Sequence, residues 1–180
     1  MTAVEFSLVA PIFLMMMLGL YDLGQMVFGK IQLQGVVQDA ARSSSLETAN
    51  TSEADAKVLE GVRKILPGAT IESKRQSYYD FTDIARPEKW DDTNKNGTCD
   101  NGETFVDENR TGDWEADVGR DNNGGAGDVV LYTVTVTYKR AFPVPFWGSD
   151  AERTMVATAV KKNQPFAAQQ ALGSSVGKCT

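Results

Sequence analysis

The chain has 180 residues, enough for one compact domain and an extension. Its net charge of −6 is concentrated: the segment from Trp90 to Asp128 has 11 acidic and 3 basic residues, whereas the remainder has 13 and 15. The sequence has no basic stripe, so nothing in it indicates nucleic-acid binding. It also has no histidine, the commonest general base and zinc ligand. We therefore expect neither an enzyme nor a small-molecule substrate, and the local acidic charge favours a cation site.

The N-terminal segment is apolar from Val4 to Phe28. Between Ala3 and Phe28 the only residues charged at neutral pH are Glu5 and Asp22. As a helix this segment is about 37 Å long, enough to cross the hydrocarbon core of a bilayer. A helix on the surface of a soluble domain would have a polar face, which this segment lacks.

The helical pattern continues to about Leu46, which gives a helix of roughly 45 residues and about 65 Å. That length, and the missing basic start, argue against a cleaved secretory signal. A domain this small cannot cover the first half of the helix, so lipid or other copies of the chain must do so. We divide the chain into an N-terminal helix, 1–46, and a head, 47–180.

Glu5 is a carboxylate one turn into an apolar helix, a position that costs about 2.5–3.5 kcal/mol at the centre of a bilayer. The amine of Met1, on the same chain or a neighbour, is close enough to neutralise it, and neutralisation between subunits would favour one axial register during assembly. Pro11 removes a backbone hydrogen bond and should kink or locally open the helix.

The start of the chain, MTAVEFSLVAPIFLMMMLGLYDLGQ, resembles class III signal-peptide proteins, and in particular the TadE-like pilins of Flp/Tad systems. The residues that match the two parts of the family pattern are Ala3, Val4, Glu5, Phe6, Leu8, Val9 and Pro11, followed by Gly19, Asp22 and Gly24. The resemblance implies that Met1, Glu5, Phe6 and Pro11 take part in filament assembly.

The resemblance also implies how the chain is processed, located and assembled. A prepilin peptidase would remove a short basic leader, so the numbering would start at the processed end. The precursor would lie in the bacterial inner membrane, bound to lipid and the pilus assembly machinery. The product would be a helical homopolymer, an extracellular pilus with a role in adhesion or surface attachment. The alternative is a membrane-anchored extracytoplasmic calcium-binding module that does not polymerise.

The head is expected to be α+β, with a second helix and an antiparallel sheet. Ser52 and Asp55 form a capping-box pattern that starts the helix, and Pro67-Gly68 ends it. Alternating residues predict the strands. The other expected elements are strands over 69–79, 129–139 and 153–161, an irregular connection at 142–148 and a tail at 167–180 that is flexible unless Cys179 holds it.

The acidic insertion, 90–128, contains a calcium-loop pattern, D-x-[DN]-x-[DN]-G-x₅-E. The residues that fit it are Asp92, Asn94, Asn96, Gly97, Asp100 and Glu103. The side-chain oxygens would converge on one Ca²⁺ while the glycine makes the turn, and Thr98 would add its backbone carbonyl. Oxygen ligands favour Ca²⁺ over transition metals. The alternative is a solvated acidic loop without a metal.

A degenerate second copy of the pattern begins shortly after the first ends. Its residues are Asp107, Asn109, Thr111 and Gly112, followed by Asp113, Glu115 and Asp117. The final position is Val118, so a closing carboxylate would have to come from Asp117 or Asp121. The sequence leaves this second ion open. It also leaves open whether Cys99 and Cys179 form a disulfide.

Overall fold

The computed structural model describes residues 3–44, 51–140, 152–165 and 167–180. Met1 and the connection at 142–148 lie outside these ranges. The chain forms two compact units, which we name the helical unit and the loop unit. The helical unit comprises Met1–Ala40, Ser52–Ser73 and Thr133–Thr158, and the loop unit comprises Ala41–Thr51, Lys74–Tyr132 and Ala159–Thr180.

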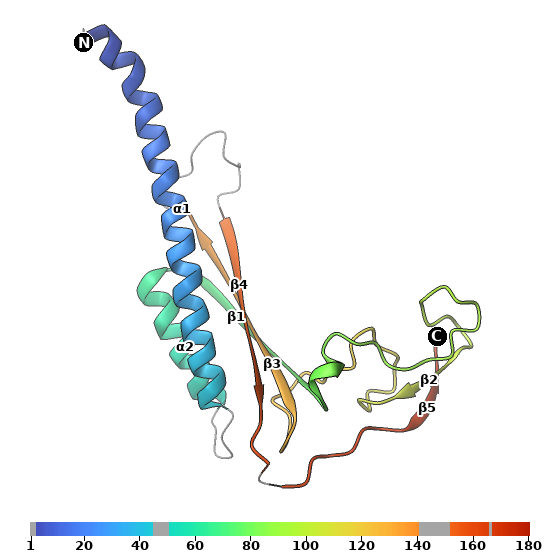
Figure 1. Ribbon diagram of the computed structural model, residues 1–180. Helices are drawn as coiled ribbons and strands as arrows, with labels where there is room; N and C mark the ends of the chain where they lie inside the picture. Colours follow the sequence, from blue (N-terminus) through green and yellow to red (C-terminus); the bar gives the residue numbers. More distant parts are fainter. Residues whose placement is uncertain (1–2, 45–50, 141–151, 166) are drawn as a thin grey trace. The chain divides into compact units, whose positions relative to one another are not determined.

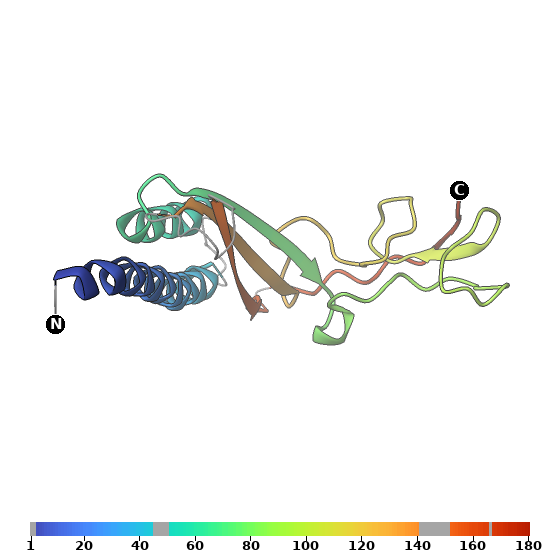
Figure 2. The same cartoon turned by 90° about the horizontal axis from the view of Figure 1, so that it is seen from above.

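Two helices lie side by side in the helical unit, on the same face of the sheet (Figures 1 and 2). They are α1, Ala3–Ser43, and α2, Thr51–Ile65. The helices approach closely at Gly61, where an added Cβ would lie 3.0 Å from a methyl group of Val36. The side chains that form the core of this contact recur at helical spacing, and include Leu33, Val37, Val58 and Val62.

The three-stranded sheet confirms the predicted strands closely. Its strands are β1, Thr70–Tyr78, β3, Val129–Lys139, and β4, Glu152–Lys162, in the order β1-β3-β4. In the central strand, β3, alternate side chains from Val130 to Val136 are fully buried, as the period of two requires. Together with the helices, this gives the expected α+β fold with antiparallel sheets.

The loop unit contains a second, two-stranded sheet that the sequence did not indicate. Strand β2, Thr104–Asp107, lies inside the acidic insertion and pairs antiparallel with β5, Ser175–Lys178, in the tail. The ring of Phe105 is buried against Gly177, which has no side chain to obstruct it. The tail is therefore held at its end by a strand, beside the acidic insertion (Figure 1).

Candidate functional site

The first predicted calcium loop is a closed turn in the loop unit. The two carboxylate oxygens of Asp92 accept the backbone N–H groups of Asn96 (3.1 Å) and Gly97 (2.9 Å). Gly97 has a φ of 81°, a conformation that favours glycine. The first carboxylate of the pattern and its glycine therefore fix the turn, as the sequence pattern predicts.

The other side chains of this loop meet at Asp100. The amide nitrogens of Asn94 and Asn96 both donate to the same oxygen of Asp100, each at 2.6 Å. The carboxylate of Glu103 joins the two ends of the loop, because it accepts the N–H of Thr93 (2.9 Å) and that of Asp100 (3.0 Å). Three of the expected ligand side chains thus lie together, and Glu103 bridges the loop beside them.

The second loop repeats the hydrogen bonds of Asp92 and Asp100, with each partner shifted along the chain by the spacing between Asp92 and Asp107. Asp107 accepts the N–H groups of Thr111 (3.0 Å) and Gly112 (3.1 Å), and Gly112 has a φ of 92°. Glu115 takes the place of Asp100: it accepts the amide of Asn109 (2.5 Å) and the hydroxyl of Thr111 (2.8 Å). The degenerate copy is therefore built like the first loop, although its sequence fits the pattern poorly.

Glu88 occupies the position in the second loop that Glu103 has in the first. One oxygen of Glu88 accepts the N–H of Glu108 at 2.8 Å, and the other accepts that of Glu115 at 3.3 Å. The donors to Glu88 follow the donors to Glu103, Thr93 and Asp100, by the spacing between the two loops. Glu88 itself, however, precedes Glu103 by the same spacing. Sequence reasoning missed Glu88, because it looked for the closing carboxylate after the loop. The shift between the copies, applied to Glu103, leads to Val118, so this pattern did not point to Glu88.

The residues expected to close the second loop lie elsewhere. Asp117 accepts hydrogen bonds from Gln76 (3.3 Å) and from the hydroxyl of Tyr78 (3.0 Å). Burial and this contact with Asp117 raise the pKa of Tyr78. Asp121 forms an exposed ion pair with Lys74. Asp113 belongs to the loop through its backbone, since its carbonyl accepts the hydroxyl of Thr111 at 3.2 Å.

The two loops differ in burial. The first is largely exposed, whereas Asp107 and Asn109 of the second are only 7% and 5% exposed. Glu88 is 0% exposed, and among the described residues no Lys or Arg lies within 4 Å of its carboxylate. Burial, above all, raises the pKa of Glu88. Its neighbour Glu108 is similarly buried but is paired with Arg86 at 2.9 Å.

No group of three or more Asp, Glu, Cys or His side chains in the described ranges is arranged as a ready-made metal site. Each loop instead brings carboxylates together with amide or hydroxyl groups. These side-chain types suit Ca²⁺, which accepts carboxylate, amide and carbonyl oxygens in flexible geometry, although here the amide groups of Asn94, Asn96 and Asn109 present their nitrogens to the carboxylates. Calcium binding by these loops therefore remains a prediction.

The tail fastens the first loop. A disulfide joins Cys99 to Cys179, with a Cα–Cα distance of 5.7 Å. Next to it, the N–H of Gly102 donates to the carbonyl of Cys179 (3.0 Å), and the N–H of Cys179 donates to that of Glu103 (2.9 Å). The bond lies directly before Asp100 in the chain and so holds the ligand side of this loop in place.

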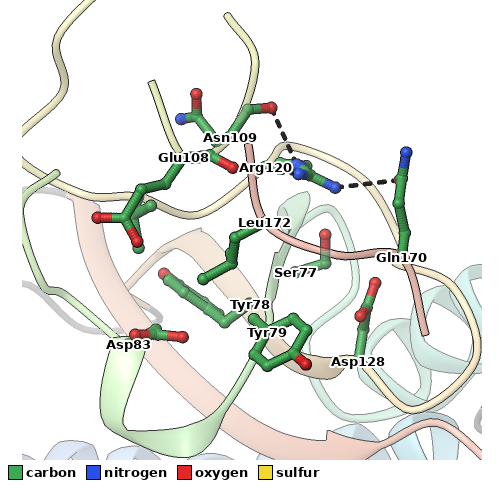
Figure 3. Close-up of a pocket in the computed structure, with 11 residues that line it drawn as sticks. Ser77, Tyr78, Tyr79, Asp83, Glu108, Asn109, Arg120, Asp128, Gln170 and Leu172 are labelled. Atoms are coloured by element: carbon green, nitrogen blue, oxygen red, sulfur yellow. Dashed lines mark hydrogen bonds between the residues drawn. The ribbon is translucent and has the colours of Figure 1, made fainter. Parts of the chain in front are cut away.

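The tail also contacts the second loop, through Arg120 (Figure 3). The guanidinium group donates to the carbonyls of Asn109 (2.9 Å) and Glu108 (3.3 Å), and to the side chain of Gln170 (3.3 Å). The cavity beside these groups has a volume of about 20 Å³, room for about one water molecule and too little for an organic ligand. Arg120 is therefore a structural link between loop and tail.

The predicted assembly residues lie at the start of α1. Glu5 is in its first turn, Phe6 is exposed, and the helix continues through Pro11 to Ser43 without interruption. The helix is long and apolar enough to cross a membrane, a test that a signal sequence also passes. Its most apolar stretch is only 6% buried, however, and a core helix of a soluble protein would be mostly buried.

Comparison with known proteins identifies the same segment. A family model described as TadE-like protein matches residues 1–42. The match covers almost all of α1 and none of the acidic insertion. No curated protein and no solved structure matches the chain.

Proposed function

We propose that this chain is a structural subunit of an extracellular Tad-like filament, and the match of residues 1–42 to the TadE-like family model supports an association with the Tad pilus. The observation that carries the proposal is the apolar surface of α1. From Val4 to Leu20 the large apolar side chains are 38–71% exposed. So much apolar surface is unstable in water, and it requires lipid before assembly and other copies of the helix afterwards.

Glu5 favours a polymer over a solitary anchor. A carboxylate near the start of a membrane helix has a cost that a simple tether has no reason to bear. In a filament, a positive charge on a neighbouring copy would neutralise it and select one axial register. A tethered calcium module, the competing proposal, predicts single molecules in detergent and gives Glu5 no role.

The test compares Glu5→Ala with Ser7→Ala, a matched change on the same exposed turn. The hydroxyl group of Ser7 donates a hydrogen bond to the carbonyl of Val4 in its own helix. Both variants should enter the membrane fraction like the wild type. Electron microscopy of sheared surface material should show filaments for the wild type and Ser7→Ala, and few or none for Glu5→Ala. Normal filaments from Glu5→Ala would refute this role, and wild-type material that is monomeric throughout would favour the tethered module.

We further propose that both loops of the head bind Ca²⁺. The first would use the side chains of Asp92, Asn94, Asn96, Asp100 and Glu103 with the carbonyl of Thr98. The second would use Asp107, Asn109, Thr111, Glu115 and Glu88 with the carbonyl of Asp113. When bound, each ion would supply positive charge to its acidic loop. Its proposed role is structural and not catalytic.

The support for the second site is the charge of Glu88. A buried carboxylate without a cation nearby is costly, and backbone N–H groups only partly offset that cost. A divalent cation would offset the rest. Titration calorimetry on the full chain in detergent should give two calcium ions per chain, with dissociation constants of about 10⁻⁴–10⁻³ M, typical of extracellular modules. No binding heat up to about 10 mM calcium would reject the proposal.

A further inference from the structure

The most buried charged contact of α1 lies where its free part ends. Asp22 forms an ion pair with Arg153 of β4, at 2.8 Å, and the two side chains are only 11% and 16% exposed. A second nitrogen of Arg153 lies 2.9 Å from the sulfur of Met26, one turn further along the helix. All three residues belong to the helical unit.

Asp22 is the first charged side chain of the stripe by which α1 packs on the rest of the unit. The buried and half-buried positions of this stripe are Gly19, Asp22, Met26, Gly29, Leu33 and Val37. Strand β4 continues the contact at Gly29, where an added Cβ would lie 3.3 Å from Met155. Before Asp22, by contrast, the large apolar side chains are exposed.

The length of the free part matches a bilayer. From Ala3 to Tyr21 there are about 19 residues, roughly 28 Å of helix, against a hydrocarbon core of about 30 Å. Polar groups begin at its end: the hydroxyl of Tyr21 accepts a hydrogen bond from Gln25 at 2.7 Å, and tyrosine is a typical residue of the membrane interface.

We propose that the Asp22–Arg153 pair sets the depth at which the anchored protein sits in the membrane. This inference rests on the proposed membrane anchoring. The hydrocarbon extends along α1 to about residue 21, and the beginning of β4 lies in the headgroup layer of a phospholipid surface. Arg153 neutralises Asp22 there, so the helix enters the lipid up to this point, and the packed sheet prevents deeper entry.

The test labels single cysteines on α1 with a membrane-impermeant maleimide, using the full chain in phospholipid vesicles with the native disulfide intact. Suitable positions are Met17, Leu20 and Gln25, because all three side chains are exposed in the protein itself. With few copies per vesicle, their protection reports contact with lipid and not with a second copy of the helix. In the wild-type background, cysteine at Gln25 should be labelled, and cysteines at Met17 and Leu20 should be protected.

Removing the positive charge should move the boundary. In Arg153→Gln, Asp22 loses its partner and draws its turn of the helix towards water, so labelling at Leu20 should rise on the order of tenfold (about 1.4 kcal/mol). Arg153→Lys keeps the charge and should leave labelling low. The double variant Asp22→Asn/Arg153→Gln carries no charge and should restore protection, which separates the effect from damage to the head.

One result would refute the membrane anchor, and a different result would refute only the depth-setting role of the ion pair. If cysteine at Met17 reacts as fast as cysteine at Gln25 in the wild-type background, the membrane anchor itself is wrong. If Met17 is protected but labelling at Leu20 is the same in all these backgrounds, the anchor stands and the depth-setting role of the pair is refuted.

Discussion

The contribution of each loop to calcium binding can be measured separately by replacing its closing carboxylate with an amide. Glu88→Gln keeps the shape of the buried side chain and one of its two acceptor oxygens, but replaces the other oxygen by an NH2 group and removes the negative charge from the second loop. Glu103→Gln makes the same change in the first loop. Because Glu88 is fully buried without a nearby cation, its neutralisation removes the cost of a buried charge, which offsets the loss of one backbone hydrogen bond, and the calcium-free protein should be about as stable as the wild type.

The effect should appear on adding calcium. A site with a dissociation constant of about 10⁻⁴ M stabilises the folded chain by about 2 kcal/mol at roughly 2 mM calcium. For a chain of this size, that raises the melting temperature by about 4–8 °C per site. Wild-type protein should gain both increments, and each single variant should gain one.

The assay is thermal unfolding of the full chain in detergent, with calcium and with excess chelator, together with calorimetric stoichiometry. We expect two ions for the wild type, one for either variant and none for the double variant. If Glu88→Gln kept both ions and the whole increment, Glu88 would not be a ligand. If the wild type had equal melting temperatures with calcium and with chelator, the proposal that calcium binds and stabilises the two loops would be refuted.

Three further changes test other parts of the structure. Cys179→Ser opens a link between residues 80 apart and should lower the free energy of unfolding in urea by up to about 4 kcal/mol; wild-type protein in reductant should match it, and no loss would contradict a structural role. Gly61→Val drives methyl groups into Val36 and should cost about 1–3 kcal/mol by thermal unfolding, whereas Gly35→Val, with open space around it, should cost little. Lys161 is 7% exposed, and burial and Arg75 lower its pKa to about 8. Between pH 8 and about 10.5 the unfolded state binds the proton and the native state does not, so the free energy of unfolding should rise with pH by up to about 3 kcal/mol, a slope absent in Lys161→Met.

The regular elements could be predicted because local sequence determines them. The alternation in β3 and the helical spacing of Val58 and Val62 depend on burial of one face, which is visible in the sequence. The first calcium-loop pattern is equally local. Its turn follows from the spacing of Asp92 and Gly97, and the structure has the corresponding hydrogen bonds.

The contacts that were missed join segments far apart in the chain. The pairing of β2 with β5 depends on Gly177 leaving room for Phe105, which no period of two or 3.6 reveals. The partner of Asp22 lies near the other end of the sequence, at Arg153. Glu88 was missed for another reason: a pattern read in one direction assumes that each loop carries all its own ligands.

The second loop is closed by a carboxylate that lies outside it in the sequence, and this has a consequence for protein engineering. Glu103 ends one loop and Glu88, placed ahead of both, reaches the other. A peptide comprising 107–118 would lack its closing group, and so would a graft of those residues into another scaffold. The smallest portable piece of the second loop therefore runs from Glu88 to Glu115 and includes the whole first loop, so an insertion or deletion in the first loop would also disturb the second.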